Sequence, residues 1–353
     1  MRFDHETLPQ RVRFASGAAA AGLAAEVELL GGRRAMVIAD PAARAVAREI
    51  ADGLTVVHWH DRDGDVVMHI PVAVAERARA AATEHDVDVV VAVGGGSTTG
   101  LAKAVALTSG LPVIAVPTTY AGSEATAVWG LTEGARKTTG TDPRVLPRAV
   151  VYDATLTLSL PVGMSVASGL NALAHCVDSM WAPRTDPIDQ ALAAEGVRAL
   201  RTGLPLIAKE PQGLEGRERA LYGAFLSATA FASAGSGLHH KICHVLGGMF
   251  DLPHAQTHAV VLPHVLAFNA PHAAEAERRL AAAFDAPTAT AGLTLLYDEL
   301  DPPRALRDLG MPEDGITPAA EAIVAAAPPD NPRAVTLEPV LRLVRAAWEG
   351  ARP

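Results

Sequence analysis

The sequence predicts an α/β domain with a parallel sheet, followed by a domain built only of helices. Short runs of Val and Ile alternate with amphipathic segments over roughly the first 157 residues, whereas long amphipathic segments without such runs fill the remainder. A chain of 353 residues also exceeds what one hydrophobic core usually organises. We therefore expect two domains, residues 1–157 and residues 158–353.

The strands of the first domain are expected where apolar residues run without interruption, because strands of a parallel sheet are covered on both faces. A helix is expected between two of them, over 72–85 (VAVAERARAAATEH), where apolar residues recur at helical spacing. The expected strands are 34–40 (RAMVIAD), 86–93 (DVDVVVAV), 111–119 (LPVIAVPTT) and 148–153 (RAVVYD).

The second domain is expected to begin after the segment SLPVGM at 159–164, where the Val and Ile runs stop. Long stretches with apolar residues at helical spacing follow, and none of them reads as a strand. The expected helices include 166–181 (VASGLNALAHCVDSMW), 189–207 (DQALAAEGVRALRTGLPLI) and 217–233 (RERALYGAFLSATAFAS).

Composition excludes several classes of protein. The net charge is −9 and no basic run is long enough to follow a phosphate backbone, so we expect no nucleic-acid partner. The two cysteines, Cys176 and Cys243, do not suggest a disulfide framework. The first ten residues, MRFDHETLPQ, lack an apolar signal region, and no apolar run spans a bilayer. We expect a cytoplasmic protein with no membrane partner.

A glycine-rich stretch, VVAVGGGSTTGLAKAVAL at 90–107, joins an expected strand to an expected helix. Gly94, Gly95 and Gly96 remove every Cβ at this junction, so backbone N–H groups can approach a phosphate closely. The helix, expected to start near Thr98, would direct its positive end there, and Ser97 could act as a ligand and as the N-cap. The pattern is not GxGxxG, and a tight glycine turn is the alternative.

Two further segments support nucleotide binding in this domain. The stretch VPTTYAGSEAT at 116–126 follows a strand, and its residues Thr118, Thr119 and Ser123 could bond a ribose or a carboxamide. Asp40 closes the first expected strand, where a carboxylate can accept from an adenosine ribose hydroxyl. Asp40 could equally be an N-cap of the helix that follows.

Histidines gather in the second domain, where six of the thirteen lie within residues 237–264. His240 and His244 are four residues apart, and so are Asn171 and His175, so each pair shares one face of a helix. His254 follows a proline ten residues after His244. Two such helices can converge on a metal or acid–base site, although any single histidine could be an ordinary core or surface residue.

These motifs, in this order, resemble the iron-containing (group III) alcohol dehydrogenase superfamily. They are GGGS at 94–97, PTTYAGSE at 117–124, the helical pair, and HxxxHxxGxxxxxPH from His240 to His254. Within the superfamily, the stretches GGGSTTGLAKA, YAGSEAT, WGLTEGARKTTGTDPRVLPRAVVYD and GLHHKICHVLGG resemble the maleylacetate reductases.

The resemblance implies a dehydroquinate synthase-like fold with a Rossmann-like dinucleotide-binding domain, a helical domain and an active site between them. It also implies NADH, with NADPH as a further possibility, and a homodimer. The cofactor residues expected on this basis and on the motifs are Asp40, Gly94, Gly95, Gly96, Ser97, Thr98, Thr118, Thr119, Ser123 and Lys137.

The sequence departs from the metal-dependent members of the superfamily at a ligand position. Those members bind Fe²⁺ or Zn²⁺ with one Asp and three His, and the matching residues here are Asn171, His175, His240 and His254. An amide offers no anionic oxygen, so a cation should bind more weakly. Gly100 is a second departure, because many relatives carry Asp there. Maleylacetate reductases share both departures and are regarded as working without metal, so we expect no required metal.

Loss of the Asp is consistent with reduction of a C=C bond conjugated to a ketone, because an enolate is much less basic than an alkoxide and a histidine can stabilise it. We expect NAD(P)H-dependent reduction of maleylacetate to 3-oxoadipate in the degradation of aromatic compounds. Lys241 and the histidines would attract the dianionic substrate, unless Lys241 is simply solvated. The expected catalytic residues are His244, His254, His240, His175, Asn171 and Lys241, with the polar steps assigned to His244 and His254 and a lesser role to His258.

Three other functions remain open on the sequence. A metal-dependent alcohol or polyol dehydrogenase would still use Asn171 as a ligand. A sugar-phosphate lyase or phosphopolyol dehydrogenase would favour basic phosphate-binding residues in the helical domain, which are not evident. A catalytically inactive NAD-binding protein would not need histidines at all three of the positions that match His ligands in the superfamily.

Overall fold

The computed structural model describes residues 2–67, 70–134 and 136–353. The chain divides into two compact units. The α/β unit is Thr7–Leu160, and the helical unit is Pro161–Pro353 together with residues 2–6. The division falls three residues beyond the expected one, and the sequence did not indicate that the N-terminal segment groups with the helices.

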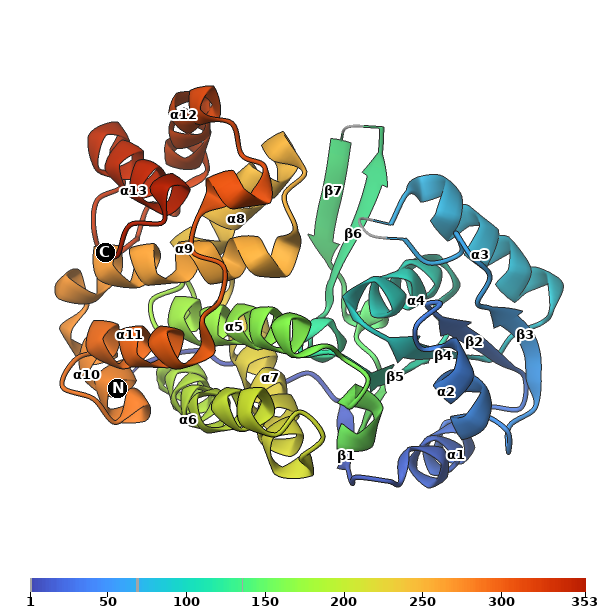
Figure 1. The fold of residues 1–353 in the computed structure, drawn as a ribbon. Helices are drawn as coiled ribbons and strands as arrows, with labels where there is room; N and C mark the ends of the chain where they lie inside the picture. The colour runs from blue at the N-terminus through green and yellow to red at the C-terminus, as the bar shows by residue number, and fades with distance from the viewer. Residues whose placement is uncertain (1, 68–69, 135) are drawn as a thin grey trace. The chain divides into compact units, whose positions relative to one another are not determined.

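Six parallel strands form the sheet of the α/β unit within the described residues, in the order β1-β8-β5-β4-β2-β3 (Figure 1). The expected α/β architecture with a parallel sheet is confirmed, as is the helical second part. The sheet strands are β1 (Arg11–Phe14), β2 (Ala35–Ala39), β3 (Val56–His60), β4 (Val89–Gly94), β5 (Val113–Pro117) and β8 (Ala149–Tyr152).

Alternate residues of the sheet pack against helices on opposite faces. Val37 and Val91 lie in a core with α1 and α2, whereas Met36 and Val90 lie in a second core with α3 and α4. This double burial explains the uninterrupted Val and Ile runs. The helices are α1 (Ala19–Leu29), α2 (Arg44–Ile50), α3 (Val72–Glu84) and α4 (Gly96–Ser109).

Four strands were not expected from the sequence. The strand β1 (RVRF) is exposed along its whole length, and β3 (VVHWH) carries two histidines, so neither presents a continuous apolar run. The strands β6 (Val128–Glu133) and β7 (Arg136–Thr141) pair as an antiparallel hairpin outside the sheet. Long-range pairing determines β1 and β3, whereas β6 and β7 pair with each other across a short connection.

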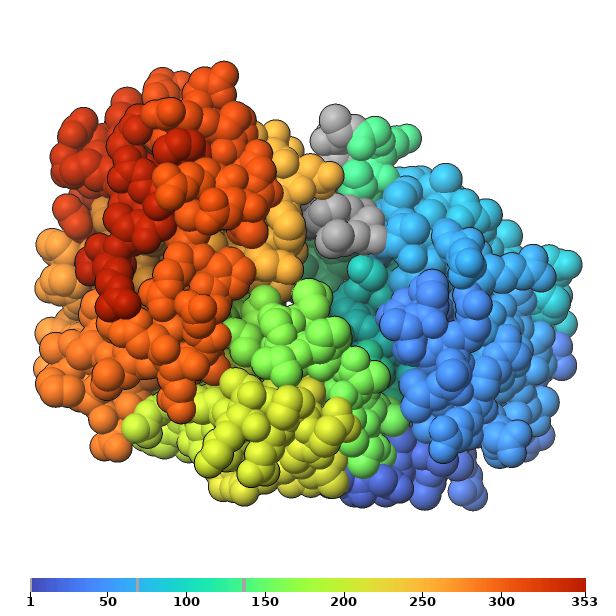
Figure 2. Space-filling view, viewed as in Figure 1, coloured from blue at the N-terminus to red at the C-terminus, as the bar shows by residue number. Residues whose placement is uncertain are grey.

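The helical unit consists of packed helices around a separate apolar core (Figures 1 and 2). In the space-filling view its orange and red C-terminal segments pack closely on one another. Within the described residues, no helix is both long and apolar enough to cross a membrane. The helices are α5 (Val162–Ser179), α6 (Pro187–Lys209), α7 (Leu214–Ala234), α8 (Leu238–Phe250), α9 (His254–Asn269), α10 (Ala274–Phe284), α11 (Ala289–Leu300), α12 (Ile316–Ala326) and α13 (Leu337–Glu349).

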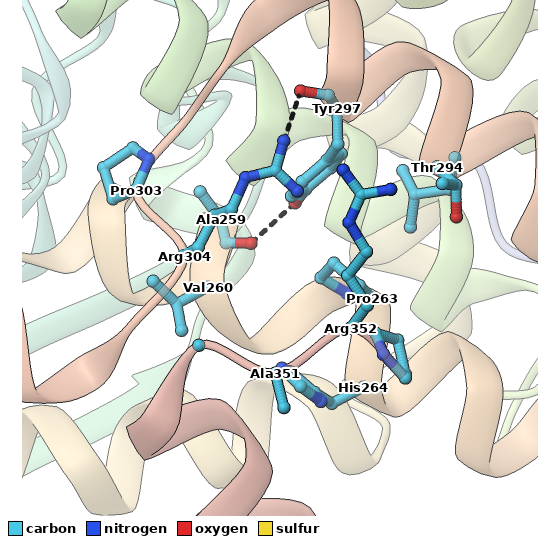
Figure 3. Close-up of a pocket in the computed structure, with 13 residues that line it drawn as sticks. Ala259, Val260, Pro263, His264, Thr294, Tyr297, Pro303, Arg304, Ala351 and Arg352 are labelled. Atoms are coloured by element: carbon cyan, nitrogen blue, oxygen red, sulfur yellow. Dashed lines mark hydrogen bonds between the residues drawn. The ribbon is translucent and has the colours of Figure 1, made fainter.

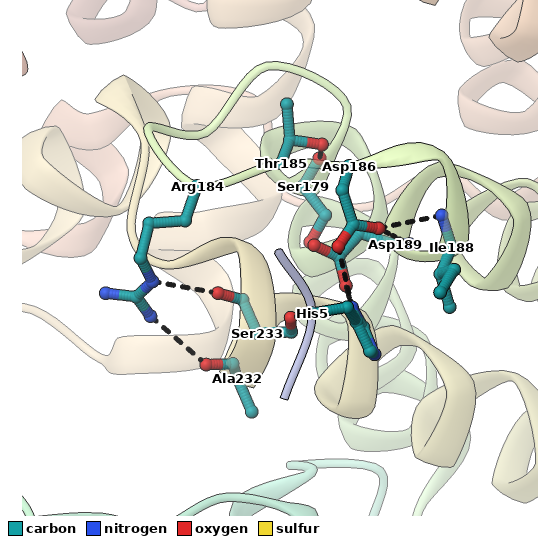
Figure 4. A network of polar contacts seen from close by, with 9 residues as sticks. All are labelled: His5, Ser179, Arg184, Thr185, Asp186, Ile188, Asp189, Ala232 and Ser233. Atoms are coloured by element: carbon teal, nitrogen blue, oxygen red, sulfur yellow. Dashed lines mark hydrogen bonds and ion pairs between the residues drawn. The ribbon is translucent and has the colours of Figure 1, made fainter. Parts of the chain in front are cut away.

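The N-terminal segment is tied to the helical unit by a buried polar network (Figure 4). His5 Nδ1 lies 2.7 Å from Asp186 Oδ2 and 3.8 Å from Asp189 Oδ1. The other oxygen of Asp186 accepts the backbone N–H groups of Ile188 and Asp189, which caps the start of α6. Burial and the neighbouring Asp186 charge raise the pKa of Asp189 to about 6.

The helix α9 is held along one side by α11 and the C-terminal segment (Figure 3). The Tyr297 hydroxyl donates to the Ala259 carbonyl at 2.6 Å, and Arg304 donates to the Tyr297 carbonyl at 3.0 Å. The hollow beside them has a volume of about 40 Å³ and is lined by Pro263 and His264 among others. It is large enough for water but too small for a dicarboxylate.

Candidate active site

The glycine loop of the α/β unit is shaped by contacts that exclude side chains. Gly94 ends β4 with φ of +149°, and a Cβ there would lie 2.5 Å from Thr98 Oγ1 and 2.6 Å from Asp40 Oδ2. A Cβ on Gly95 would lie 3.2 Å from Thr119 Cγ2. Close neighbours therefore require glycine at position 94 and leave little space for a side chain at position 95.

The helix α4 begins at Gly96, two residues earlier than expected, so Ser97 is not its N-cap. Gly95 occupies the N-cap position and provides no side-chain cap. The first N–H groups of α4 therefore donate no hydrogen bond to a capping side chain, and they carry the positive end of the helix dipole. A loop with small residues, free N–H groups and this dipole fits a pyrophosphate.

Asp40 has a structural role in this unit. Its Oδ1 accepts the Ala43 N–H at 2.9 Å, and its Oδ2 accepts the Thr98 hydroxyl at 3.2 Å. The helix α2 itself begins at Arg44 with Ala43 at its N-cap position, so Asp40 caps the turn that leads into α2 and not the helix proper. Asp40 instead closes the turn after β2 and links it to α4. A carboxylate has further lone pairs, so these two bonds leave it able to accept from a ribose.

The hydroxyl-rich segment after β5 lies beside the glycine loop. The Thr118 N–H donates to the Gly94 carbonyl at 3.1 Å, and Thr119 packs against Gly95. Ser123 is held through its carbonyl, which accepts from the buried Lys103 ammonium at 2.6 Å. Burial lowers the pKa of Lys103 to about 7. Lys137 belongs to β7, and its side chain lies outside the described residues.

Gly100 has a steric explanation. A Cβ at this position would lie 2.5 Å from Ile70 Cδ1. Ile70 has a positive φ of 28°, which is uncommon for a β-branched residue. An Asp at position 100 would have to displace this side chain.

The histidines of the helical unit gather where α5, α8 and α9 meet. The rings of His175 and His240 stack with centroids 4.9 Å apart, and Phe231 packs against both. The His240 and His244 centroids are 6.3 Å apart. His175, His240 and Asn171 are buried. In the part of the chain that the structure describes, Asn171 Oδ1, His175 Nδ1 and His240 Nε2 have no hydrogen-bond partner.

Asp178 positions this cluster, although it was not among the residues expected to act there. Its carboxylate accepts His240 Nδ1–H at 2.7 Å and the backbone N–H of Gly237 at 2.9 Å, which fixes the start of α8. The carboxylate fills the space where a Cβ on Gly237 would lie, 2.3 Å from Oδ1. His240 is therefore held with Nε2 directed away from Asp178. The sequence signal available for Asp178 was its position on α5, three residues after His175, which places both side chains on one face of that helix.

His258 lies inside the cluster, contrary to the lesser place expected for it. Its ring centroid is 4.4 Å from that of His254 and 4.9 Å from that of His240. His239, likewise not anticipated, has its Nε2 2.9 Å from His258 Nδ1. The signal for His258 was its spacing of four residues from His254, which places both on one face of α9.

Burial decides the charge of the inner histidines. It lowers the pKa of His175, His239, His240 and His258 well below the usual value, and neighbouring histidines add to this effect. These rings are therefore neutral near pH 7 even though Asp178 accepts from His240. His244 and His254 are exposed, and Lys241 is half-buried. The cluster thus has a neutral inner part and solvent-accessible outer histidines.

The residues matching the metal ligands of the superfamily form a weak donor set for a divalent cation. Asn171 offers a neutral amide oxygen, and His175, His240 and His254 offer neutral imidazoles. No carboxylate among them balances the charge of Fe²⁺ or Zn²⁺, since Asp178 is engaged by His240 and backbone N–H groups. The chemistry of these four ligand positions therefore fits Fe²⁺ or Zn²⁺ poorly.

Both parts of the chain match family models. Residues 9–154 match the iron-containing alcohol dehydrogenase model, and residues 165–348 match the C-terminal model of the Fe-containing alcohol dehydrogenase family. The chain belongs to the iron-containing alcohol dehydrogenase family. It is therefore an oxidoreductase.

Several full-length relatives of this family are similar to the chain. A maleylacetate reductase from Sphingobium indicum is 46% identical over 361 residues, covering 100% of this chain and 99% of the relative. The crystal structure of an iron-containing alcohol dehydrogenase from Corynebacterium glutamicum is 58% identical with a TM-score of 0.96, covering 99% and 97% of the two chains. That of a maleylacetate reductase from a Rhizobium species is 42% identical with a TM-score of 0.94, covering 100% and 99%.

Proposed function

We propose that this oxidoreductase reduces the C=C bond of maleylacetate with NADH, giving 3-oxoadipate. The observation that carries the proposal is the buried histidine cluster with Asn171 in place of a metal-binding carboxylate. Full-length similarity to enzymes named maleylacetate reductase supports the choice of substrate.

The cluster suits a reaction that needs proton transfer rather than a strong Lewis acid. When bound, the reduced nicotinamide supplies a hydride to the carbon β to the ketone. The π electrons then collect on the ketone oxygen as an enolate, and a proton restores the ketone by adding at the α carbon. Because an enolate is a weaker base than an alkoxide, a histidine N–H can stabilise it.

Within the cluster we assign different tasks to the inner and outer histidines. His244 and His254 are exposed, so they can exchange protons with solvent and protonate the enolate. His240, fixed by Asp178, presents Nε2 to the same group of rings. His175, Asn171 and Lys241 are assigned to binding the substrate carboxylates, because each can donate a hydrogen bond to an anion.

The cofactor is assigned to the glycine loop. Gly94, Gly95 and Gly96 with the uncapped start of α4 support binding of the pyrophosphate. Asp40 supports binding of a ribose, and its negative charge disfavours a 2′-phosphate, so NADH is proposed over NADPH. The remaining cofactor contacts are assigned to Ser97, Thr98, Thr118, Thr119, Ser123 and Lys137.

We further propose that turnover needs no metal, because the donor set at Asn171 lacks an anion. A homodimer in the cytoplasm, acting in the breakdown of aromatic compounds, is the setting that the resemblance favours.

The decisive experiment compares two reactions of the purified enzyme with and without exhaustive chelation by EDTA. We expect rapid NADH oxidation with maleylacetate in both conditions, and little NAD⁺ reduction with simple alcohols or polyols. Activity only with alcohols, lost in EDTA and restored by Zn²⁺ or Fe²⁺, would overturn the proposal in favour of a metal-dependent dehydrogenase. No turnover with either substrate class would indicate a binding protein.

A further inference from the structure

Three side chains in and next to the histidine cluster bring together potential metal-ligand atoms. They include a thiol, which can become an anionic ligand, whereas the residues that match the superfamily's metal ligands include no anion. The three residues are His239, Cys243 and His258, all of them buried. The one ligand atom of each lies within 4.8 Å of the other two. The reaction proposed above uses neither the Cys243 thiol nor His239.

The arrangement follows from two packed helices. His239 and Cys243 lie four residues apart on α8, so their side chains share one face. His258 faces them from α9, one turn beyond His254. His239 Nε2 lies 2.9 Å from His258 Nδ1 and 3.6 Å from Cys243 Sγ.

These separations match those around a tetrahedral zinc ion. With Zn–S of about 2.3 Å and Zn–N of about 2.0–2.1 Å, tetrahedral geometry places sulfur and nitrogen ligands roughly 3.6 Å apart and two nitrogen ligands roughly 3.3 Å apart. The distance between Cys243 Sγ and His239 Nε2 already has this value, and the ligand atoms of Cys243 and His258 lie within 4.8 Å of each other. The two nitrogens need to separate by about 0.4 Å. Small side-chain rotations on α8 and α9 are enough for that.

The chemistry of the set also suits zinc. Two imidazoles and one thiolate are a common ligand combination for zinc. Zinc binding would replace the Cys243 S–H bond by a Zn–S bond, and the released proton would pass to solvent. The proton shared between the two histidines would move to the far nitrogen of its ring. Among the described residues, His239 Nδ1 and His258 Nε2 have no hydrogen-bond partner, so this shift breaks no hydrogen bond that the structure describes.

We propose that His239, Cys243 and His258 form a zinc-binding site, separate from the position at which metal-dependent members of the family hold their ion. A thiolate supplies the negative charge that Asn171 cannot, so this set should bind a borderline-soft dication more tightly than the neighbouring donor set. The proposal does not rest on the proposed reaction, since its thiolate ligand Cys243 and the zinc ion have no part in that reaction.

Cobalt provides a direct test, because a thiolate bound to Co²⁺ gives an intense charge-transfer absorption that nitrogen and oxygen ligands do not. The chelator-treated wild-type enzyme should develop this absorption with Co²⁺ and lose it when Zn²⁺ is added in equal amount. Cys243→Ser should abolish the absorption and weaken zinc binding by at least about 100-fold. Cys176→Ser, which alters the other cysteine in the chain, should leave both unchanged.

X-ray absorption of the zinc-loaded wild-type enzyme covers the case in which Cys243→Ser does not fold. One sulfur and at least two histidine ligands would support the site. Zinc without a sulfur ligand would overturn it, and so would failure of the wild type to retain Zn²⁺ at micromolar concentration. Turnover of maleylacetate is measured in a separate assay. If the enzyme does not reduce maleylacetate, the metal-binding measurements still decide whether the zinc site exists.

Discussion

The glycine loop of the α/β unit and the histidine cluster of the helical unit are built on opposite principles. The loop consists of backbone, and its neighbours Thr98, Asp40 and Thr119 close in until there is no space for a Cβ on Gly94 and little on Gly95. The cluster consists of side chains from α5, α8 and α9, brought together by Asp178 and by ring packing.

This difference determines how each region should respond to substitution. A backbone site tolerates changes in chemistry but not in volume, whereas a side-chain cluster depends on the identity of each donor and its partner. The expected effects below are ordered from the largest to the smallest.

The largest effect is expected from removing the outer histidines. His244→Ala and His254→Ala should each lower kcat/KM for maleylacetate by about 10²–10⁴, because each removes an acid–base group. The affinity for NADH, measured by fluorescence titration, should remain nearly unchanged.

His258→Ala tests whether an inner histidine of the cluster also contributes to the reaction. The sequence alone predicts a small effect, but its ring contacts with His254 and His240 predict a loss of at least about tenfold in kcat/KM. The exposed His272 provides the matched control, and His272→Ala should behave as wild type. A crippled His258→Ala beside a near-normal His244→Ala would show that the reaction uses the inner histidines.

Asn171→Asp tests whether charge alone makes the cluster a poor metal site. The carboxylate should raise affinity for Zn²⁺ at this position by about 10–100-fold, because it restores an anionic ligand. Metal content after dialysis and calorimetric titration provide the measurement, and Asn171→Ala, which offers no ligand, should show no gain. Equal zinc affinity in both variants would show that geometry rather than charge weakens this position.

Gly95→Val tests the glycine loop as the cofactor site by adding side-chain volume to it. The side chain would meet Thr119 and enter the proposed phosphate path, so affinity for NADH should fall by at least about tenfold while the fold is retained. Gly53, which has open space around it, provides the control, and Gly53→Ala should bind NADH normally. Unchanged binding by Gly95→Val would remove the loop from the cofactor site.

The remaining prediction concerns stability, which is a different measure from activity or affinity, and it involves neither region. The pKa of Asp189 is raised to about 6 in the folded state from an ordinary value of 3.8. The folded state therefore holds this proton more tightly, and the resulting stabilisation is present below about pH 4 and lost as the pH rises through 6.

Asp189→Asn, which cannot ionise, should accordingly be more stable relative to wild type at pH 7 than at pH 4. The change should be at most about 3 kcal/mol in the free energy of unfolding, measured by denaturant titration at each pH. The exposed Asp285 provides the control, since Asp285→Asn should show no such pH dependence. A stability difference that does not change with pH would mean that Asp189 titrates normally.

The sequence by itself determined the features that arise from neighbouring residues. The Val and Ile runs predicted β2, β4, β5 and β8, because a strand buried on both faces must be apolar throughout. The glycine loop was visible because a strand, three glycines and a helix are consecutive in the chain. The i, i+4 pairs on α5 and α8 were visible because helix geometry is local.

Only the tertiary structure decided which of these residues act together. Asp178 caps α8 although it belongs to α5, and His258 joins His239 across two helices. Thr119 and Ile70, from distant segments, limit the space for a side chain at Gly95 and Gly100. The strand β1, fully exposed and polar in part, is a strand only because β8 pairs with it. Such contacts depend on packing between segments far apart in the chain, which local periodicity does not encode.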